Sequence, residues 1–397
     1  MSVTLVAIAC TNSSSGTPAS GARQASPTAP AGSAADSKAA GLRARLDLLL
    51  GEHVMVIAKD SLAATANRSD EYKGYATLLT RNGSDISDMM ASAFGTSAAA
   101  NFDQIWAAQN NYFVDYTVGI VSHNASKSNG AASGLVNGFV PQFAQFMSSM
   151  TSIPADPITQ LATEQVQETK AIIDDQAALN NAKMFSDLHR AYAQSSRIGD
   201  ALASAIARKF PDKFPGNPAV KAVDFRVSLV GLLQEHSYVA TMATSAAAAG
   251  RNTEQAAALN ALASNADSLG TVFSQVFGAA TGTRFDQVWG ARDAELVVYA
   301  GTTDATTRQT ALTSLTDGFV TQFASLVHDA TNLTEADVTG PAQGQITDMI
   351  HVIDDQRTKS ATNVASDDHT AAEATIPIGD LIATAAAAKV PANFAPG

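Results

Sequence analysis

Apolar residues recur every three or four positions along most of the chain, which is the spacing of one face of an α-helix. The first such stripe holds Leu42, Leu46, Leu49, Leu50 and Ile57. Two marks of β-structure are absent, namely strict alternation of apolar and polar residues and Asn-Gly turns between β-rich runs. The pattern therefore predicts an all-α fold.

The pattern also occurs twice. Residues 102–116 read FDQIWAAQNNYFVDY, and residues 285–299 read FDQVWGARDAELVVY, which is an offset of 183. Later matches, such as IIDDQ at 172–176 and VIDDQ at 352–356, have an offset of 180. Three residues are thus missing from the second copy, between the positions of Tyr116 and Gly138 in the first. A repeat of this length is domain-sized, so we expect two homologous helical-bundle units, residues 38–216 and 217–397.

Six helices are predicted in each unit, and each unit is expected to fold cooperatively on its own. A proline-rich segment, FPDKFPGNP at 210–218, joins the units. Pro141 is expected to kink the fourth helix, whereas the second unit has Thr321 at that position. The first unit's helices are predicted at 38–66, 70–94, 100–123, 132–150, 157–178 and 180–210, and the second unit's at 220–249, 253–277, 283–301, 306–330, 341–360 and 362–389.

The N-terminal residues have features of a targeting signal. Residues 1–9 are uncharged and mostly apolar, and an A-x-A-like box, Ala7-Ile8-Ala9, directly precedes Cys10. Residues 10–37 are rich in Ser, Ala, Pro and Gly, a composition typical of a flexible tether. The segment resembles a bacterial lipoprotein signal, although Ala7 stands where Leu is usual. No basic residue precedes the apolar run, which indicates a truncated signal segment.

The resemblance implies that Cys10 is acylated and holds an extracytoplasmic protein at a membrane surface. Secretion without an anchor is the alternative localisation. The competing interpretation of Cys10 itself is a chance cysteine in an irregular N-terminus. Because the chain has only this one cysteine, a disulfide framework and cysteine-rich metal sites are excluded.

The net charge of the chain and its distribution bear on which partners the protein can bind. The formal net charge is −12, and it is uneven: residues 37–216 hold 15 basic and 17 acidic residues, whereas residues 217–397 hold 9 and 19. No basic stripe is present, so a nucleic-acid partner is not expected. The acidity of the second half indicates a solvated face or, alternatively, a surface that attracts cations or a partner.

No catalytic motif is found. The sequence lacks a Walker loop, G-x-G-x-x-G, G-x-S-x-G and H-E-x-x-H, and no histidine follows a Glu by three residues as in di-iron bundles. We therefore expect a non-catalytic protein with a binding or structural role in the cell envelope.

Two histidine positions recur in both units and support an alternative function. A site that combines His53, Glu52 and His189, and its counterpart that combines His236, Glu235 and His369, would suit zinc or copper. The competing interpretation is that each histidine is a buried core residue with a hydrogen bond to a carboxylate or a carbonyl.

Aromatic residues at helical spacing are expected in the core: Trp106, Tyr116, Trp289 and Tyr299. A role in stacking on a ligand is the alternative. Together with the Leu-Leu-x-Glu-His motif and the run IGDALASAIARKFPDKFPG, these residues resemble a family of exported, lipoprotein-like bacterial proteins with tandem helical bundles. This family has no established activity, so the resemblance implies location and fold. Members often carry a histidine three residues after the Trp, where this chain has Gln109 and Arg292. If that histidine is a ligand, the site here is weakened.

Overall fold

The computed structural model describes residues 34–395, and this part of the chain is helical throughout, with no strand. The predicted all-α class is confirmed. The signal segment, Cys10 and nearly all of the tether lie outside the described residues. The first half contains η1 (Ala34–Asp36), α1 (Lys38–Thr65), α2 (Ser69–Phe94), α3 (Thr96–Val121), α4 (Ala125–Ser133), η2 (Gly134–Phe139), α5 (Val140–Thr151), α6 (Ala155–Ala177) and α7 (Asn181–Lys209).

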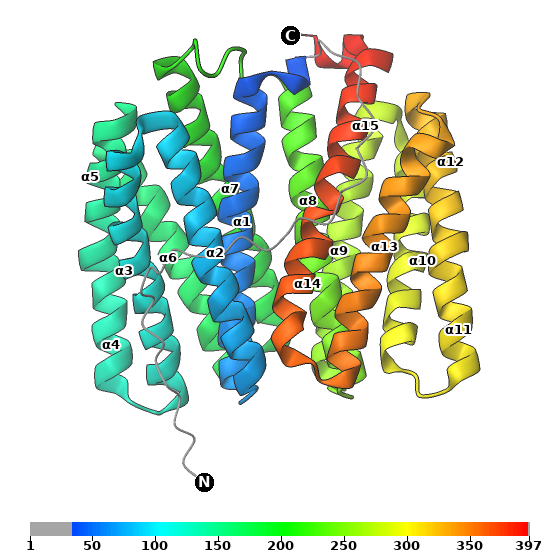
Figure 1. The fold of residues 1–397 in the computed structure, drawn as a ribbon, viewed down its shortest axis with the longest axis horizontal. Coiled ribbons are helices and arrows are strands. Elements are labelled where there is room, and N and C mark those ends of the chain that lie inside the picture. Colours follow the sequence, from blue (N-terminus) through cyan, green and yellow to red (C-terminus); the bar gives the residue numbers. More distant parts are fainter. Residues whose placement is uncertain (1–33, 396–397) are drawn as a thin grey trace.

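The second half follows with elements in nearly the same order (Figure 1). These are α8 (Lys221–Ala248), α9 (Asn252–Phe277), α10 (Ala279–Gly301), α11 (Ala305–Thr313), η3 (Ser314–Phe319), α12 (Val320–Thr331), α13 (Glu335–Thr358), α14 (Ala361–Glu373), α15 (Thr375–Lys389) and η4 (Pro391–Phe394).

Glycines end the second helix of each half. Gly95 follows α2 and Gly278 follows α9, and both have a φ of 91°, a conformation that costs glycine little because it has no Cβ. The next helix begins at once. The three residues missing from the second half are lost at the end of α10, which has 23 residues where α3 has 26.

The fourth predicted helix is interrupted, and the reason differs from the one expected. A π-helical segment, η2, separates α4 from α5, and Pro141 lies in the first turn of α5, directly after it. The second half has a π-helical segment at the equivalent place, η3, although Thr321 replaces the proline. Proline therefore does not cause the irregularity. The last predicted helix of the second half is also divided, at Ala374, into α14 and α15.

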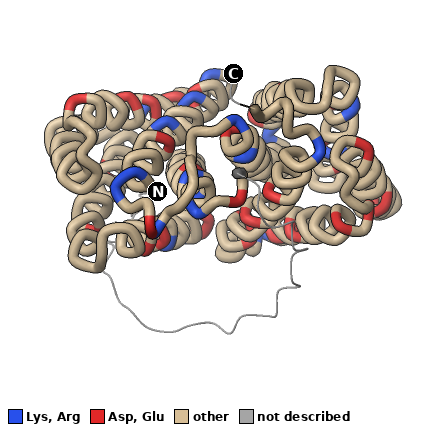
Figure 2. The backbone as a smooth tube through the Cα atoms, turned by 90° about the horizontal axis from the view of Figure 1, so that it is seen from above, with Lys and Arg blue, Asp and Glu red and all other residues tan. Residues whose placement is uncertain are grey.

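Helices α1 and α8 lie side by side at the centre of the molecule (Figure 1). Of the 28 residues in each, 22 are buried in α1 and 20 in α8, so both helices are covered on nearly all sides. The second half carries acidic residues on its central helix α8, namely Asp224 and Glu235, as well as on its outer helices, and Figure 2 shows acidic positions scattered over the molecule. None of the described helices is long and apolar enough to cross a membrane.

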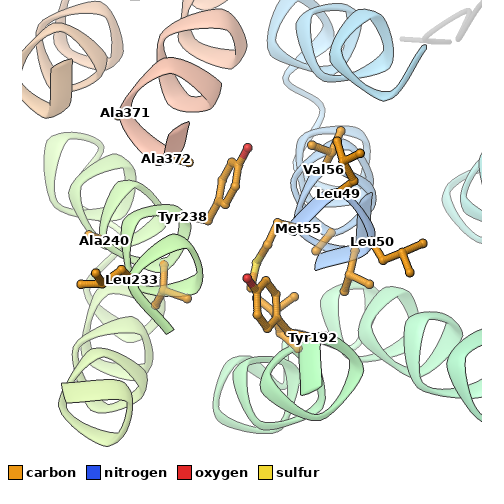
Figure 3. Close-up of a cluster of buried hydrophobic side chains, with 14 of the residues drawn as sticks. Leu49, Leu50, Met55, Val56, Tyr192, Leu233, Tyr238, Ala240, Ala371 and Ala372 are labelled. Carbon is orange, nitrogen blue, oxygen red and sulfur yellow. The ribbon is translucent and has the colours of Figure 1, made fainter. Parts of the chain in front are cut away.

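α7 in the first half and the corresponding α14 in the second half each pack against the other half. α7 packs against α1 and also against α9, while α14 packs against α2 and α8. A single cluster of buried apolar side chains runs through both halves, and Met55 of α1 lies close to Tyr192 of α7 in the space between α1 and α8, with Tyr238 projecting from α8 (Figure 3). The two halves thus share one hydrophobic core.

Candidate functional site

The recurring histidines and glutamates pair across the two halves. His369 on α14 hydrogen-bonds through Nδ1 to Oε1 of Glu52 on α1 at 2.5 Å. His189 on α7 hydrogen-bonds in the same way to Glu235 on α8 at 2.8 Å. The predicted groups of His189 with Glu52 and of His369 with Glu235 are not formed, because α7 and α14 each pack against a helix of the opposite half.

Glu52 is a fully paired buried carboxylate. Its side chain also accepts hydrogen bonds from the hydroxyl of Tyr238 at 2.7 Å and from Nδ2 of Asn82 at 3.0 Å. Burial alone would raise the pKa of Glu52, but the hydrogen bond and the charge of His369, with the bonds from Tyr238 and Asn82, outweigh it and lower the pKa. Glu52 is therefore ionised and holds the two halves together at their centre.

A second buried group lies one to two turns further along α1. Lys59 donates to Asp368 on α14 and to Thr241 on α8, both at 2.5 Å. Tyr75 on α2 donates to the same carboxylate at 2.9 Å. The side chains of Lys59 and Asp368 are only 4% and 0% exposed, so this ion pair lies in the core. Burial lowers the pKa of Lys59 despite the nearby Asp368.

His53 belongs to a separate cluster inside the first half. Its Nε2 bonds Oδ1 of Asn110 at 2.8 Å, and its ring centre lies 4.6 Å from that of Trp106. Burial lowers the pKa of His53 to about 4, so the ring is neutral at pH 7. Neither Glu52 nor His189 is a hydrogen-bond partner of His53. The metal-ligand set that the sequence predicted for this half is therefore not assembled.

His236 has the equivalent place in the second half, with different partners. Its Nδ1 and Nε2 bond Asn265 at 3.0 Å and Asp293 at 2.9 Å. Its predicted partner His369 bonds Glu52 instead. Within residues 34–395, no group of three or more His, Cys, Asp or Glu side chains is placed so that it could hold a metal ion. In this part of the chain, the side chains predicted to bind zinc or copper are therefore not arranged as a metal site.

The four predicted core aromatics are all buried, with exposed fractions of 4–6%. The hydroxyls of Tyr116 and Tyr299 reach Asp174 and Asp354 at 2.5 and 2.9 Å. Trp106 and Trp289 each stack on a neighbouring phenylalanine, Phe102 and Phe285.

A small cavity lies beside Trp106 in the first half. It offers about 20 Å³ to the centre of a water molecule, which is room for about one water-sized group. Two buried carbonyl oxygens among its lining residues, Oε1 of Gln109 and Oε1 of Gln165, have no hydrogen-bond partner. The cavity is lined by Leu50, His53, Val54, Trp106, Gln109, Phe139, Phe143, Ala162, Gln165, Ser195 and Ile198, none of which is a charged residue at pH 7.

Trp106 also lines a second space on its outer side. A groove of about 290 Å³ between α2 and α3 is bounded by Trp106, Asn110 and Gly83 among others. A Cβ at Gly83 would lie 3.3 Å from Cδ1 of the indole, and the second half has Ala266 at that position. Trp106 therefore forms part of the walls of both the inner cavity and the outer groove.

Arg292 occupies the equivalent place in the second half. Its guanidinium donates to Gln345 at 2.9 Å and to Asp293 at 3.1 Å, and it lies 5.1 Å from the ring centre of Trp289 and 5.6 Å from that of Phe319. Gln345 is the counterpart of Gln165, so the carbonyl that lacks a partner in the first half has one here. The aligned sequences already contained this difference, Gln109-Asn110 against Arg292-Asp293.

Each π-helical segment contributes a phenylalanine to the surroundings of the tryptophan in its half. η2 brings Phe139 to 6.3 Å from Trp106, and η3 brings Phe319 to 5.4 Å from Trp289, measured between ring centres. A π-helical turn shifts the side chains that follow it relative to an α-helix, and such turns are frequent at functional sites. The spacing of apolar residues does not predict these two π-helical segments.

No family model, no curated protein and no solved structure matches this chain.

Proposed function

We propose that this chain is a non-catalytic binding protein of the cell envelope, held at a membrane surface through acylated Cys10. Its ligand enters the cavity beside Trp106 in the first half. The observation that carries the proposal is that Gln109 and Gln165, two of the residues that line this cavity, each have a buried carbonyl oxygen without a hydrogen-bond partner. A buried polar atom without a partner costs about 1–3 kcal/mol, which a donating ligand recovers.

The second half provides an internal comparison. The same scaffold places an arginine where the first half has Gln109, and its guanidinium satisfies Gln345 and lies against Trp289. The second half is thus the closed form of the site, with its own side chain in the ligand's place. The first half keeps the aromatic wall and the acceptor but lacks the arginine.

The lining favours a small, uncharged ligand that donates hydrogen bonds. No ionised side chain lines the cavity, and an ion that left water for it would lose its hydration without gaining a counter-charge. Two glutamine oxygens require N–H or O–H donors, and the aromatic rings accept apolar groups. Small primary amides and alcohols meet these conditions. Because the space is water-sized, a larger ligand inserts one such group.

The test is thermal denaturation of the full chain with formamide as the probe. Wild type is expected to gain stability relative to a variant with Gln109→Arg and Asn110→Asp, which copies the closed site. At low concentration a bound ligand stabilises by RT ln(1 + [L]/Kd), whereas non-specific effects of formamide act on both proteins alike. The reverse variant, Arg292→Gln with Asp293→Asn, should open a second site and increase the stabilisation.

Identical responses of all three proteins would refute the proposal and leave the cavity as the place of an ordered water. Membrane attachment is a separate part of the proposal and is tested separately.

A further inference from the structure

The buried ion pair between the halves has no counterpart at the equivalent place. In the group around Lys59, the first half contributes Lys59 and Tyr75, and the second half contributes Thr241 and Asp368. Tyr75 and Thr241 both donate to the carboxylate, so the pair is held by polar groups from both halves. The four residues come from four helices, α1, α2, α8 and α14.

The offsets of 183 and 180 identify the matching positions on the other side of the molecule. Met242 corresponds to Lys59, Leu188 to Asp368, Ala258 to Tyr75 and Ala58 to Thr241. All four are buried, with 0–2% exposed, where α7 packs against α9. Of the two equivalent sets of buried residues, one thus contains an ion pair and the other contains only apolar side chains.

We infer that the surface between the halves is selective for an unlike partner: a first half pairs with a second half, and neither pairs with its own kind. In a pair of two first halves, Lys59 would face Leu188 and Ala58 and would find no carboxylate. In a pair of two second halves, Asp368 would face Met242 and Ala258 and would find no cation. Each like pair would bury two unpaired charges, because the group occurs twice in a symmetric pair.

The crossed histidine–glutamate pairs do not provide this selectivity. The crossed pairs His369–Glu52 and His189–Glu235 have the same residue types at both places, so a like pair would keep them. Two tyrosine hydroxyls donate across the halves at one place only: Tyr238 to Glu52 and Tyr192 to Gln234, where the counterparts of the tyrosines are Met55 and Ala372. Loss of a neutral hydroxyl's hydrogen bond costs less than an unpaired buried charge. Selectivity depends mainly on Lys59 and Asp368, because the loss of this ion pair leaves charges unpaired in the core.

This selectivity matters because the halves are similar enough in sequence to be mistaken for one another. A duplicated chain can exchange halves with a neighbouring copy and assemble with the wrong partner. Removing one member of a buried ion pair destabilises strongly, so each like pair is expected to be disfavoured at least about 100-fold.

The test begins with the folded full chain. A protease site is inserted between Gly216 and Asn217, both exposed, and the folded protein is cut there. The two fragments are then unfolded together, refolded by dilution and weighed by native mass spectrometry, which separates the three possible pairs. Wild type is expected to give only the unlike pair.

Two variants remove the difference between the two places. One replaces the ionic residues by their apolar counterparts, Lys59→Met with Asp368→Leu. The other introduces a second ion pair, Met242→Lys with Leu188→Asp. Each should produce like pairs next to the unlike pair. A control variant in the exposed pair, Lys73→Ala with Asp70→Ala, should behave as wild type.

A statistical mixture from wild type would overturn the inference, whatever the variants do. If wild type gives only the unlike pair and both variants also do, the assignment of the selectivity to Lys59 and Asp368 is wrong. A variant that does not refold leaves the decision to the other variant and to wild type.

Discussion

His369 and Glu52 are joined by a 2.5 Å hydrogen bond, although 317 residues separate them in the chain. Its counterpart, His189 with Glu235, crosses the molecule in the opposite direction. Each half therefore supplies the histidine that pairs with the other half's buried glutamate. This exchange, together with one continuous core, makes the tandem chain a single body.

Breaking the buried ion pair should cost far more than replacing it. Lys59→Met alone leaves Asp368 buried without a cation and should lower the free energy of unfolding by about 3–5 kcal/mol. Adding Asp368→Leu should recover most of this loss, because two apolar side chains of suitable size replace the pair. Urea unfolding of the two variants measures the difference. The exposed pair serves as control: Lys73→Met should change the same free energy by less than about 1 kcal/mol. Equal losses in the single and the double variant would contradict the account.

Stability should depend on pH through His53. Its pKa is about 4 in the folded protein and about 6.5, the ordinary value of histidine, in the unfolded chain, so the unfolded chain binds the proton more tightly between these pH values. The free energy of unfolding should therefore decrease as the pH falls from about 6.5 to 4. His53→Gln should remove this contribution, which is measured as the difference between the two pH profiles. Parallel profiles would show that His53 does not titrate in this way.

Much of the fold was predictable from the sequence because periodicity and glycine positions report on local structure. The predicted helix ends at residues 94 and 277, next to Gly95 and Gly278, agree with the structure, and so does the predicted burial of Trp106 and Trp289. The packing of α7 and α14 against the opposite half could not be predicted, because equivalent residues in a duplicated chain do not reveal which half they contact. Lys59 was also missed, since a lysine at the end of an apolar run is indistinguishable from a residue whose charge reaches solvent.

The candidate cavity could also be predicted only in part from the sequence. Gln109 and Arg292 were visible as a difference at equivalent positions, yet only packing shows that one lines a space and the other fills it. The two π-helical segments that complete these places have no sequence signature in the apolar pattern.

Gly51 should tolerate no side chain. A Cβ there would lie 2.5 Å from Cε2 of Tyr192, whose hydroxyl is fixed by the carbonyl of Gly231 and by Gln234. Gly51→Ala should therefore destabilise by about 1–3 kcal/mol, although alanine is the better helix former. At Gly231 a Cβ would meet the nearest atom of Tyr192 at 3.8 Å, so Gly231→Ala is the matched control and should be neutral or stabilising. Thermal unfolding compares the two; a stabilised Gly51→Ala would contradict the packing.

Membrane attachment should depend on Cys10. Replacing Cys10 by Ser removes the only thiol and should move the protein from the membrane fraction to the soluble extracytoplasmic fraction. Mass spectrometry of the wild-type N-terminus should show acyl chains. A wild-type protein that is soluble and unacylated would exclude the lipoprotein interpretation, without bearing on the cavity.

The most direct test of the binding proposal uses the two tryptophans, because the chain contains only Trp106 and Trp289. Each indole N–H gives one signal in a proton–nitrogen NMR spectrum, and Trp106→Phe assigns them. Titration with formamide should shift the Trp106 signal with a saturable dependence and leave the Trp289 signal unchanged. In the variant with Arg292→Gln and Asp293→Asn, both signals should shift. If the Trp106 and Trp289 signals of the wild-type protein respond alike, or neither responds, the first half has no ligand cavity and the proposed function is wrong.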